Sequence, residues 1–174
     1  LASVEGTLTL AGTAAEDPSM AEPVWRLHPG PVAECPLTGL FLEHGLRRHG
    51  RLGQPFVYSN FITSLDGRIA QRDPRTGRRG VPAAIANDRD WRLFMELVAQ
   101  ADVLLVSDRL LRAVAAGRHT ALIELEANGL EDLIQWRRER GLVRQPMLAT
   151  VTRDLDIPAP DLAQRYTRDI LVVT

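Results

Sequence analysis

A group of polar residues interrupts an apolar, strand-forming stretch of the chain, PFVYSNFITSL. The stretch is rich in Phe, Val, Tyr, Ile and Thr, and it contains Asn60 before it breaks into a turn with Ser64, Asp66 and Gly67. A polar residue inside such a run either faces solvent at a sheet edge or marks a place where the sheet approaches a ligand. Asn60 and the turn that follows it are therefore the first candidate site.

An arginine-rich loop, QRDPRTGRRG, follows this turn. Its Arg78 and Arg79 are candidate contacts for a substrate phosphate, because a guanidinium binds phosphate through two parallel hydrogen bonds. The alternative interpretation is a solvated surface loop without a role in binding. The sequence leaves both interpretations open.

Other common chemistries lack the residues that they need. The chain has no GxGxxG after a strand, no HExxH and no GxSxG. Its four histidines are scattered, so we predict no metal site. The single cysteine, Cys35, has no partner for an internal disulfide, which fits a reducing compartment, and we predict a cytoplasmic protein.

The basic residues of the 174-residue chain are all arginine. The absence of lysine excludes Schiff-base enzymes and P-loop nucleotide binding. The 21 arginines and 22 acidic residues leave a net charge of -1, so we expect neither nucleic acid nor a membrane as a partner. The longest aliphatic runs, VLLV and ILVV, are far shorter than the about 18 apolar residues that indicate a membrane span.

Hydrophobic periodicity predicts alternating helices and strands in the second half of the chain. We expect a helix that Asn87 caps and that buries Trp91, Phe94, Met95 and Val98, a strand over 102–107, helices over 108–117 and 130–141, a strand over 146–152, a helix over 159–166 and a strand over 168–174. This alternation predicts an α/β fold with a mainly parallel sheet and helices on both faces.

The domain organisation follows from changes in composition along the chain. We predict a flexible N-terminal segment over 1–19, an arm over 20–54 that contains four prolines and a short apolar helix, and an α/β domain over 55–174. The last strand is apolar enough to be central, yet no helix follows it to cover the sheet. We therefore expect a domain that is incomplete at its C-terminus, with residues after 174 missing, cleaved or supplied by another chain.

The order of these motifs resembles a known family. The PFVYSN strand, the SLDGRIA turn, a polar loop, the IAND helix start and the ADVLLVS strand are similar to the reductase domain of riboflavin biosynthesis, the C-terminal half of the bacterial bifunctional deaminase-reductase. The resemblance is clearest over residues 55–107 and continues more weakly to 174. It implies a dihydrofolate reductase-like fold, a homodimer, and an oxidoreductase that uses NADPH to reduce the ribosyl group of a small phosphoribosylamino-pyrimidine.

The resemblance also assigns roles to residues of the first candidate site. Asn60 matches an Asn or Lys of the family that faces the nicotinamide and the substrate, and Asn60 and Asp66 are the implied catalytic residues. Ser64, Asp66 and Gly67 match the turn that closes over the site. Ile85 matches an apolar residue after the substrate loop, so Asn60 and Ile85 are the implied substrate contacts. Arg78 and Arg79 are the candidates to replace the phosphate contact that the family makes with another arginine.

A second set of residues is implied for the cofactor, and here the chain also departs from the family. Thr152 and Arg153 lie where the family contacts the 2′-phosphate of NADPH, and Ser107 and Arg109 follow the strand that precedes another cofactor contact. The family carries Gly and Thr and then a DPxLT stretch after that strand, which this chain lacks, and a family arginine for the substrate phosphate is replaced by Val98. The alternative is thus a reductase-like binding or dimerisation module without catalysis.

Overall fold

The structure is a computed structural model that describes residues 18–72, 74, 77, 79–81, 86–117, 122–166 and 168–174. The chain divides into two compact units, one of residues 17–100 and one that includes residues 101–174. This division falls inside the predicted 55–174 domain, and the predicted domain boundaries stay predictions. Each unit is described by itself.

The unit of residues 101–174 is built on a three-stranded parallel sheet. Its elements are β5 (Val103–Leu105), α3 (Asp108–Ala115), α4 (Glu131–Glu139), β6 (Met147–Val151), α5 (Ala159–Arg165) and β7 (Ile170–Val173). The strand order is β5-β6-β7, with Leu104 opposite Leu148 and Leu148 opposite Ile170. All of these elements lie within the ranges expected from the sequence, so the predicted mixed α/β architecture with a parallel sheet is confirmed at this level.

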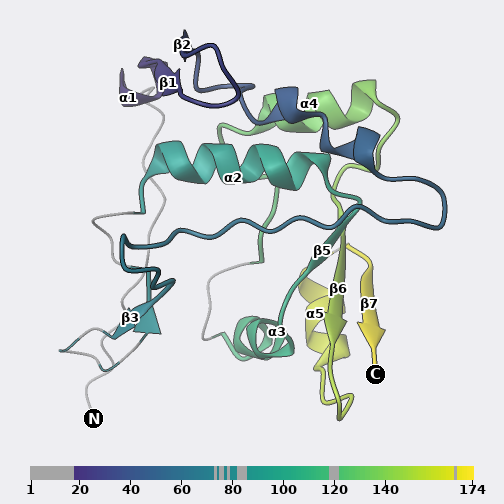
Figure 1. The fold of residues 1–174 in the computed structure, drawn as a ribbon. Coiled ribbons are helices and arrows are strands. Elements are labelled where there is room, and N and C mark those ends of the chain that lie inside the picture. Colours follow the sequence, from purple (N-terminus) through teal and green to yellow (C-terminus); the bar gives the residue numbers. More distant parts are fainter. Residues whose placement is uncertain are drawn as a thin grey trace. The chain divides into compact units, whose positions relative to one another are not determined.

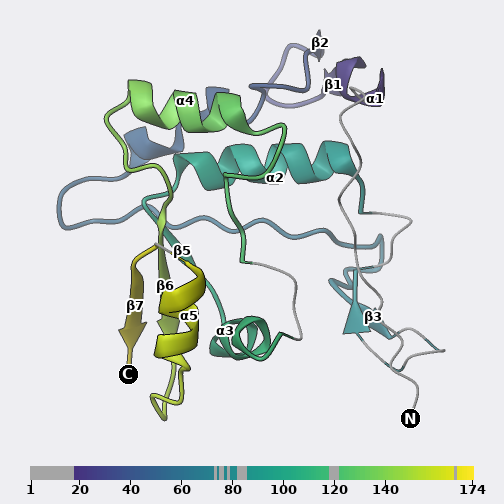
Figure 2. The ribbon, with the colours of Figure 1, turned by 180° about the vertical axis from the view of Figure 1, so that it is seen from behind.

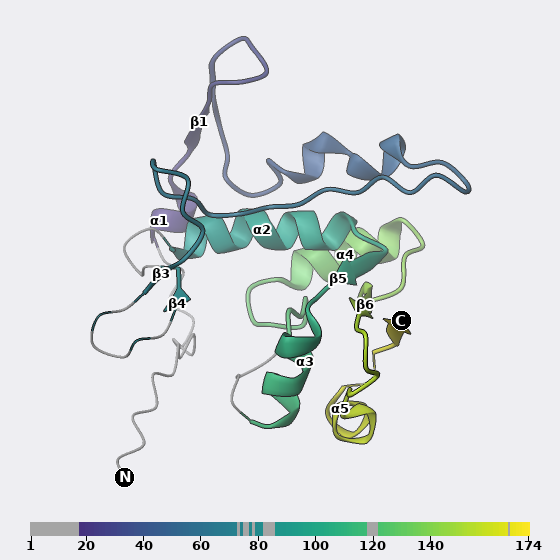
Figure 3. The same ribbon diagram turned by 60° about the horizontal axis from the view of Figure 1, so that its bottom comes forward.

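Helices α3 and α5 cover one face of this sheet. Leu111 and Val114 of α3, Leu162 of α5 and Leu148 of β6 form a buried core. Figure 1 shows α5 behind β6, Figure 2 shows it in front, and Figure 3 shows α3 and α5 on the same side of the strands. Burial of these large aliphatic side chains is worth about 1.5–3 kcal/mol for each, so this layer holds the strand ends in place.

The other face of the sheet differs from the prediction of helices on both faces. Its side chains are largely exposed, and they belong to Val103, Leu105, Met147, Val151, Leu171 and Val173. The reason lies in the strand order. Parallel strands in sequential order usually have right-handed connections, which place the covering helices on one face, and here α3 and α5 pack together against one side of β5-β6-β7. The expected burial of β5 on both faces is therefore not observed in this unit.

The unit of residues 17–100 contains one long helix and several short elements. These are α1 (Pro18–Ala21), β1 (Val24–Arg26), β2 (Ala33–Cys35), the 3-10 helices η1 (Leu42–His44) and η2 (Leu46–His49), β3 (Gln71–Arg72), β4 (Arg79–Gly80) and α2 (Asp88–Gln100). Strands β1 and β2 pair antiparallel, as do β3 and β4. The short helix expected in the arm is split into η1 and η2 at Gly45, whose φ of 55° is left-handed.

The strand expected from Pro55 onward is not formed. Residues 55–64 carry neither helix nor strand, although Figures 1 and 3 show them as an extended trace beside α2. The Tyr58 hydroxyl donates to the Leu97 carbonyl oxygen of α2 at 2.8 Å. Aromatic and β-branched residues favour an extended backbone, but a strand also needs a hydrogen-bonded neighbour, and strand propensity does not say whether one exists.

Helix α2 confirms one part of its prediction and corrects another. The Asn87 Oδ1 accepts from the Asp90 N–H at 2.9 Å and caps the helix as expected. Met95 and Val98 are buried as predicted, but Trp91 is 38% exposed. The buried face is rotated because Arg92, Glu96 and Gln100, at four-residue intervals, are also buried. Glu96 and Gln100 form hydrogen bonds with backbone groups of the arm, so this face of α2 points toward the arm.

Candidate functional site

The carboxyl ends of β5 and β6 meet at one edge of the parallel sheet. Ser107 lies two residues beyond β5, and Thr152 directly follows β6. The ladder continues to this point, because the Val106 N–H donates to the Ala149 carbonyl at 2.8 Å and the Thr152 N–H to the Val173 carbonyl at 2.9 Å. Ligands of open parallel sheets bind outside the carboxyl ends of the strands, so this edge is the candidate site.

Ser107 is the cap of helix α3. Its backbone is extended and its Oγ accepts from the Leu110 N–H at 3.2 Å, which satisfies one free amide of the first turn. Arg109, in the same turn, is exposed. The predicted cofactor contacts Ser107 and Arg109 therefore lie at a helix N-terminus, where the backbone amides favour an anion.

An acidic residue connects the two strand ends. The Asp108 Oδ2 accepts from the Thr152 hydroxyl at 3.5 Å and from Arg112 Nη2 at 2.8 Å, one helical turn further on. Its Oδ1 accepts from the Arg109 N–H at 2.6 Å. Burial alone would raise the pKa of Asp108, but the hydrogen bonds from Arg112, Arg109 and Thr152 and the charge of Arg112 outweigh it and lower that pKa. The carboxylate is therefore held in its charged form.

The loop after β6 folds back onto helix α3. Arg112 Nη1 donates to the Asp156 carbonyl at 3.2 Å, and Arg153 is exposed at the start of the loop. Leu155 has a φ of 51°, a left-handed conformation that disfavours a residue with a large side chain by about 1–2 kcal/mol. Such strain persists where the surroundings impose it and is frequent at ligand sites. Thr152 is buried, whereas Arg153 is free to reach a ligand.

The edge thus combines the exposed Ser107 with the exposed guanidinium groups of Arg109 and Arg153, beside a carboxylate that Arg112 neutralises. The Arg109 and Leu110 amides of the helix end already donate to Asp108 and Ser107. Because Arg112 pairs with Asp108 at 2.8 Å, the carboxylate repels an incoming anion less than a solitary one would. This arrangement suits an anionic group of a ligand, and it brings four predicted cofactor residues to one edge: Ser107, Arg109, Thr152 and Arg153. Comparisons with protein-family models, with curated proteins and with solved structures found no match for this chain.

The SLDG turn belongs to the other unit and forms a tight local structure. The Gly67 N–H donates to the Ser64 carbonyl at 2.8 Å, the Ser64 N–H to the Arg68 carbonyl at 2.9 Å, and Gly67 has a φ of 80°. The Asp66 carboxylate accepts from the Ser64 hydroxyl and pairs with Arg68 Nε at 2.9 Å. Asp66, a predicted catalytic residue, is exposed and has both oxygens engaged by its neighbours in the chain.

The remaining predicted residues are not brought together by the described structure. Asn60 is exposed on the unpaired segment before the turn. Arg79 lies in β4, but its side chain falls outside the description, as do Arg78 and Ile85 altogether. The predicted substrate contacts therefore stay predictions.

Sequence reasoning missed Asp108 and Arg112 as members of the site. A signal was present, because an acidic residue at the first position of a helix and an arginine four residues later form a stabilising pair on one helix face. Asp108 also accepts a hydrogen bond from Thr152, which follows another strand, and spacing along the chain does not predict this contact.

The described part of the chain holds neither a metal-binding cluster nor a membrane-spanning helix. No group of three or more His, Cys, Asp or Glu side chains is placed to hold a metal ion. No helix there combines the length and the apolarity needed to cross a bilayer.

The Asp108 network gives stability a defined pH dependence. A carboxyl whose pKa is lowered by folding stabilises the fold above its unfolded pKa, and this contribution is lost as the pH falls through the folded value. We therefore expect the free energy of unfolding to fall below pH 3.8, the ordinary value, and Asp108→Asn to flatten that fall. Urea titrations between pH 2 and pH 6 measure it. Asp161→Asn, at an exposed position of α5, is the control, and an equal flattening there would contradict the assignment.

Proposed function

We propose that this protein is an NADPH-dependent reductase that resembles 5-amino-6-(5-phosphoribosylamino)uracil reductase and has a dihydrofolate reductase-like fold. The reaction is hydride transfer from the nicotinamide to a small pyrimidine-type substrate, and it takes place in the cytoplasm. The proposal includes a homodimer. NADPH supplies the hydride, so the residues of this chain bind and orient the two reactants.

One observation carries the proposal. The Thr152 hydroxyl and the Asp108 carboxylate, 3.5 Å apart, join the carboxyl ends of two parallel strands beside the N-terminus of α3. Arg109 and Arg153 are exposed at the same edge. A guanidinium is a suitable donor for the 2′-phosphate that distinguishes NADPH from NADH. The resemblance of residues 55–107 to the reductase domain supports the same assignment.

A second function is supported by the SLDG turn. The ion pair between Asp66 and Arg68, at 2.9 Å, and the hydroxyl of Ser64 occupy the carboxylate that a catalytic role would need free. Together with the departures from the family pattern, this favours a reductase-like module that binds a nucleotide or a second copy without catalysis. Binding and turnover therefore have to be measured separately.

The test is a titration of the full chain with NADPH and with NADH by calorimetry. We expect NADPH to bind about tenfold more tightly, and Arg153→Gln to remove most of that difference because it removes a charged phosphate contact worth about 1.4 kcal/mol. Arg144→Gln is the matched control, since Arg144 is an exposed arginine that pairs with Glu126 on the same unit. Equal affinities for both nucleotides, or none, would overturn the proposal.

Turnover separates the two functions. With the phosphoribosylamino-pyrimidine as substrate, a fall in NADPH absorbance at 340 nm supports the reductase. Tight NADPH binding without that fall supports the inactive module. Light scattering at micromolar concentration tests the homodimer, which a monomeric mass would contradict.

A further inference from the structure

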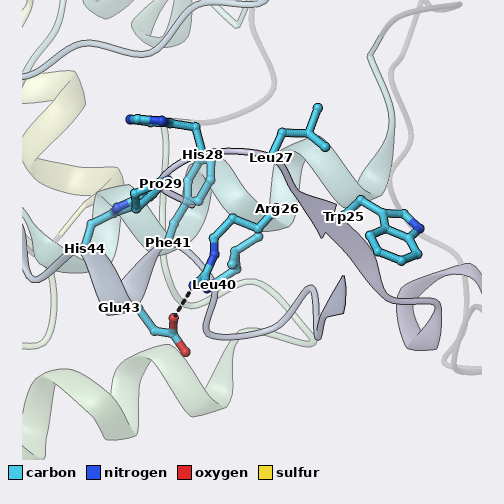
Figure 4. A pocket seen from close by; sticks show the side chains of 9 residues that line it. All are labelled: Trp25, Arg26, Leu27, His28, Pro29, Leu40, Phe41, Glu43 and His44. Carbon is cyan, nitrogen blue, oxygen red and sulfur yellow. Dashed lines mark ion pairs between the residues drawn. The ribbon is translucent and has the colours of Figure 1, made fainter. Parts of the chain in front are cut away.

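A cavity of about 460 Å³ lies within the unit of residues 17–100, and none of its lining residues is assigned to the site described above. It is formed by β1, the turn after it and the segment around η1 (Figure 4). Its size falls within the range of small-molecule sites, about 300–1,000 Å³. The lining residues are Trp25, Arg26, Leu27, His28, Pro29, Leu40, Phe41, Glu43 and His44.

The walls of this cavity suit a flat, apolar ring. Leu40, Phe41 and Pro29 contribute apolar surface, and Figure 4 shows the Phe41 ring between Pro29 and Arg26. The Phe41 and His44 rings lie 5.2 Å apart and are tilted by 55°. Aromatic side chains attract other rings in stacked or tilted geometry, which adds about 0.5–1.5 kcal/mol to simple burial.

Arg26 adds a positive charge whose guanidinium is only loosely paired with its neighbours. Its Nη1 is 3.8 Å from the Glu43 carboxylate, beyond hydrogen-bond distance, and the Glu43 side chain is 69% exposed. None of the described residues accepts a hydrogen bond from the buried Arg26 Nε. An ion pair this open contributes about 0–1 kcal/mol, so an anion with better geometry can displace Glu43 from the guanidinium.

We propose that this cavity binds a small aromatic carboxylate. The carboxylate takes the place of Glu43 on the Arg26 guanidinium, where two parallel N–H donors match its two oxygens. The ring of the ligand lies against Phe41 and Leu40. His28 and His44, which line the same cavity, come close to the ligand and report its presence.

The experiment uses 2-naphthoate as the probe and the full chain carrying ¹³C-labelled histidine. We expect saturable shifts of the His28 and His44 ring signals, with His49 unchanged because it does not line the cavity. Naphthalene-2-methanol, which has the same ring and no charge, is expected to bind at least about tenfold more weakly. Equal binding of the neutral compound would overturn the proposal, since the recognition would then be apolar only.

Two variants, each with a matched control, distinguish a specific effect on binding from misfolding of the arm, because one is expected to weaken binding and the other to strengthen it. Arg26→Gln removes the charge and is expected to weaken 2-naphthoate binding about tenfold, whereas Arg51→Gln, at an exposed arginine of the same unit, leaves it unchanged.

Glu43→Gln removes the competing carboxylate and is expected to strengthen binding about threefold. Glu22→Gln, with the same change in net charge at an exposed position, has no such effect. Glu43→Gln that binds no better than the original chain, or shifts at His49 equal to those at His44, would contradict the assignment.

Discussion

Replacing Arg137 with alanine is expected to destabilise the unit of residues 101–174 by about 3–5 kcal/mol. The Arg137 side chain is fully buried, and it donates from Nε to the Val143 carbonyl and from Nη1 to the Ala101 carbonyl, both at 2.7 Å. These bonds connect the end of α4 to Ala101, two residues before β5, and to the loop after the helix. Truncation leaves the buried Ala101 carbonyl without this donor and opens a cavity as large as the arginine side chain.

Urea unfolding followed by circular dichroism measures the effect. Arg138→Ala is the matched control, because Arg138 is the next residue of the same helix, is exposed and contacts Gln135 on the helix surface. We expect the control to change the free energy of unfolding by about 0.5 kcal/mol or less. Arg137→Lys should fall between the two, since lysine keeps the charge but loses the planar pair of donors. A loss no larger for Arg137→Ala than for Arg138→Ala would show that the buried hydrogen bonds are not needed.

Arginine has a wider structural role here than the composition suggested. The absence of lysine correctly directed attention to guanidinium groups, but the sequence favoured phosphate contacts and exposed surfaces for them. In the structure several arginines bind main-chain carbonyls instead. Arg165 donates to Val114 at 3.0 Å, and Arg168 donates to Pro146 and Ile123, both at 2.5 Å. Burial lowers the pKa of Arg168, and the nearby charge of Glu124 opposes that shift.

The elements that the sequence predicted well are those whose pattern is local. Asn87 before an apolar helical stripe predicted the start of α2. The range predicted for α3, 108–117, ends at Gly117, whose N–H donates to the Val114 carbonyl at 3.0 Å just beyond the helix. The expected strand at residue 55 and the double cover of β5 depended on which segments become neighbours. That information lies in contacts between distant parts of the chain, and periodicity does not contain it.

The candidate site also contains some contacts that are local in the sequence and others that depend on the fold. The family resemblance assigned both Ser107 and Thr152 to the cofactor, but only the pairing of β5 with β6 brings the two residues to one edge of the sheet. The neutralisation of Asp108 by Arg112, at 2.8 Å, is local to one helix and could have been found from the spacing. The ion pair between Asp66 and Arg68 is also local, but a turn sequence alone does not show which of its charged side chains will pair.

Glu96→Ala is expected to have the largest effect in the unit of residues 17–100, about 3–5 kcal/mol. The Glu96 carboxylate is fully buried on α2. Its oxygens accept from the Gly39 N–H at 2.5 Å and the Phe41 N–H at 2.9 Å, and Arg92 Nε donates to it at 3.1 Å. Alanine removes the partner of two arm amides and leaves the charge of Arg92, itself only 5% exposed, without its carboxylate. Glu34→Ala, an exposed acid of the same unit, is the control.

Two measurements distinguish loss of this network from a general loss of packing. Hydrogen exchange at the amides of Gly39 and Phe41 should accelerate far more than exchange within α2, because these amides lose their direct acceptor. The double variant Arg92→Met with Glu96→Leu should be less destabilised than the two single losses added together, because it removes both charges and leaves an apolar contact. Additive losses would show that Arg92 and Glu96 act independently. Because the same carboxylate holds the backbone on either side of Leu40, its removal should also weaken 2-naphthoate binding in the cavity lined by Leu40 and Phe41.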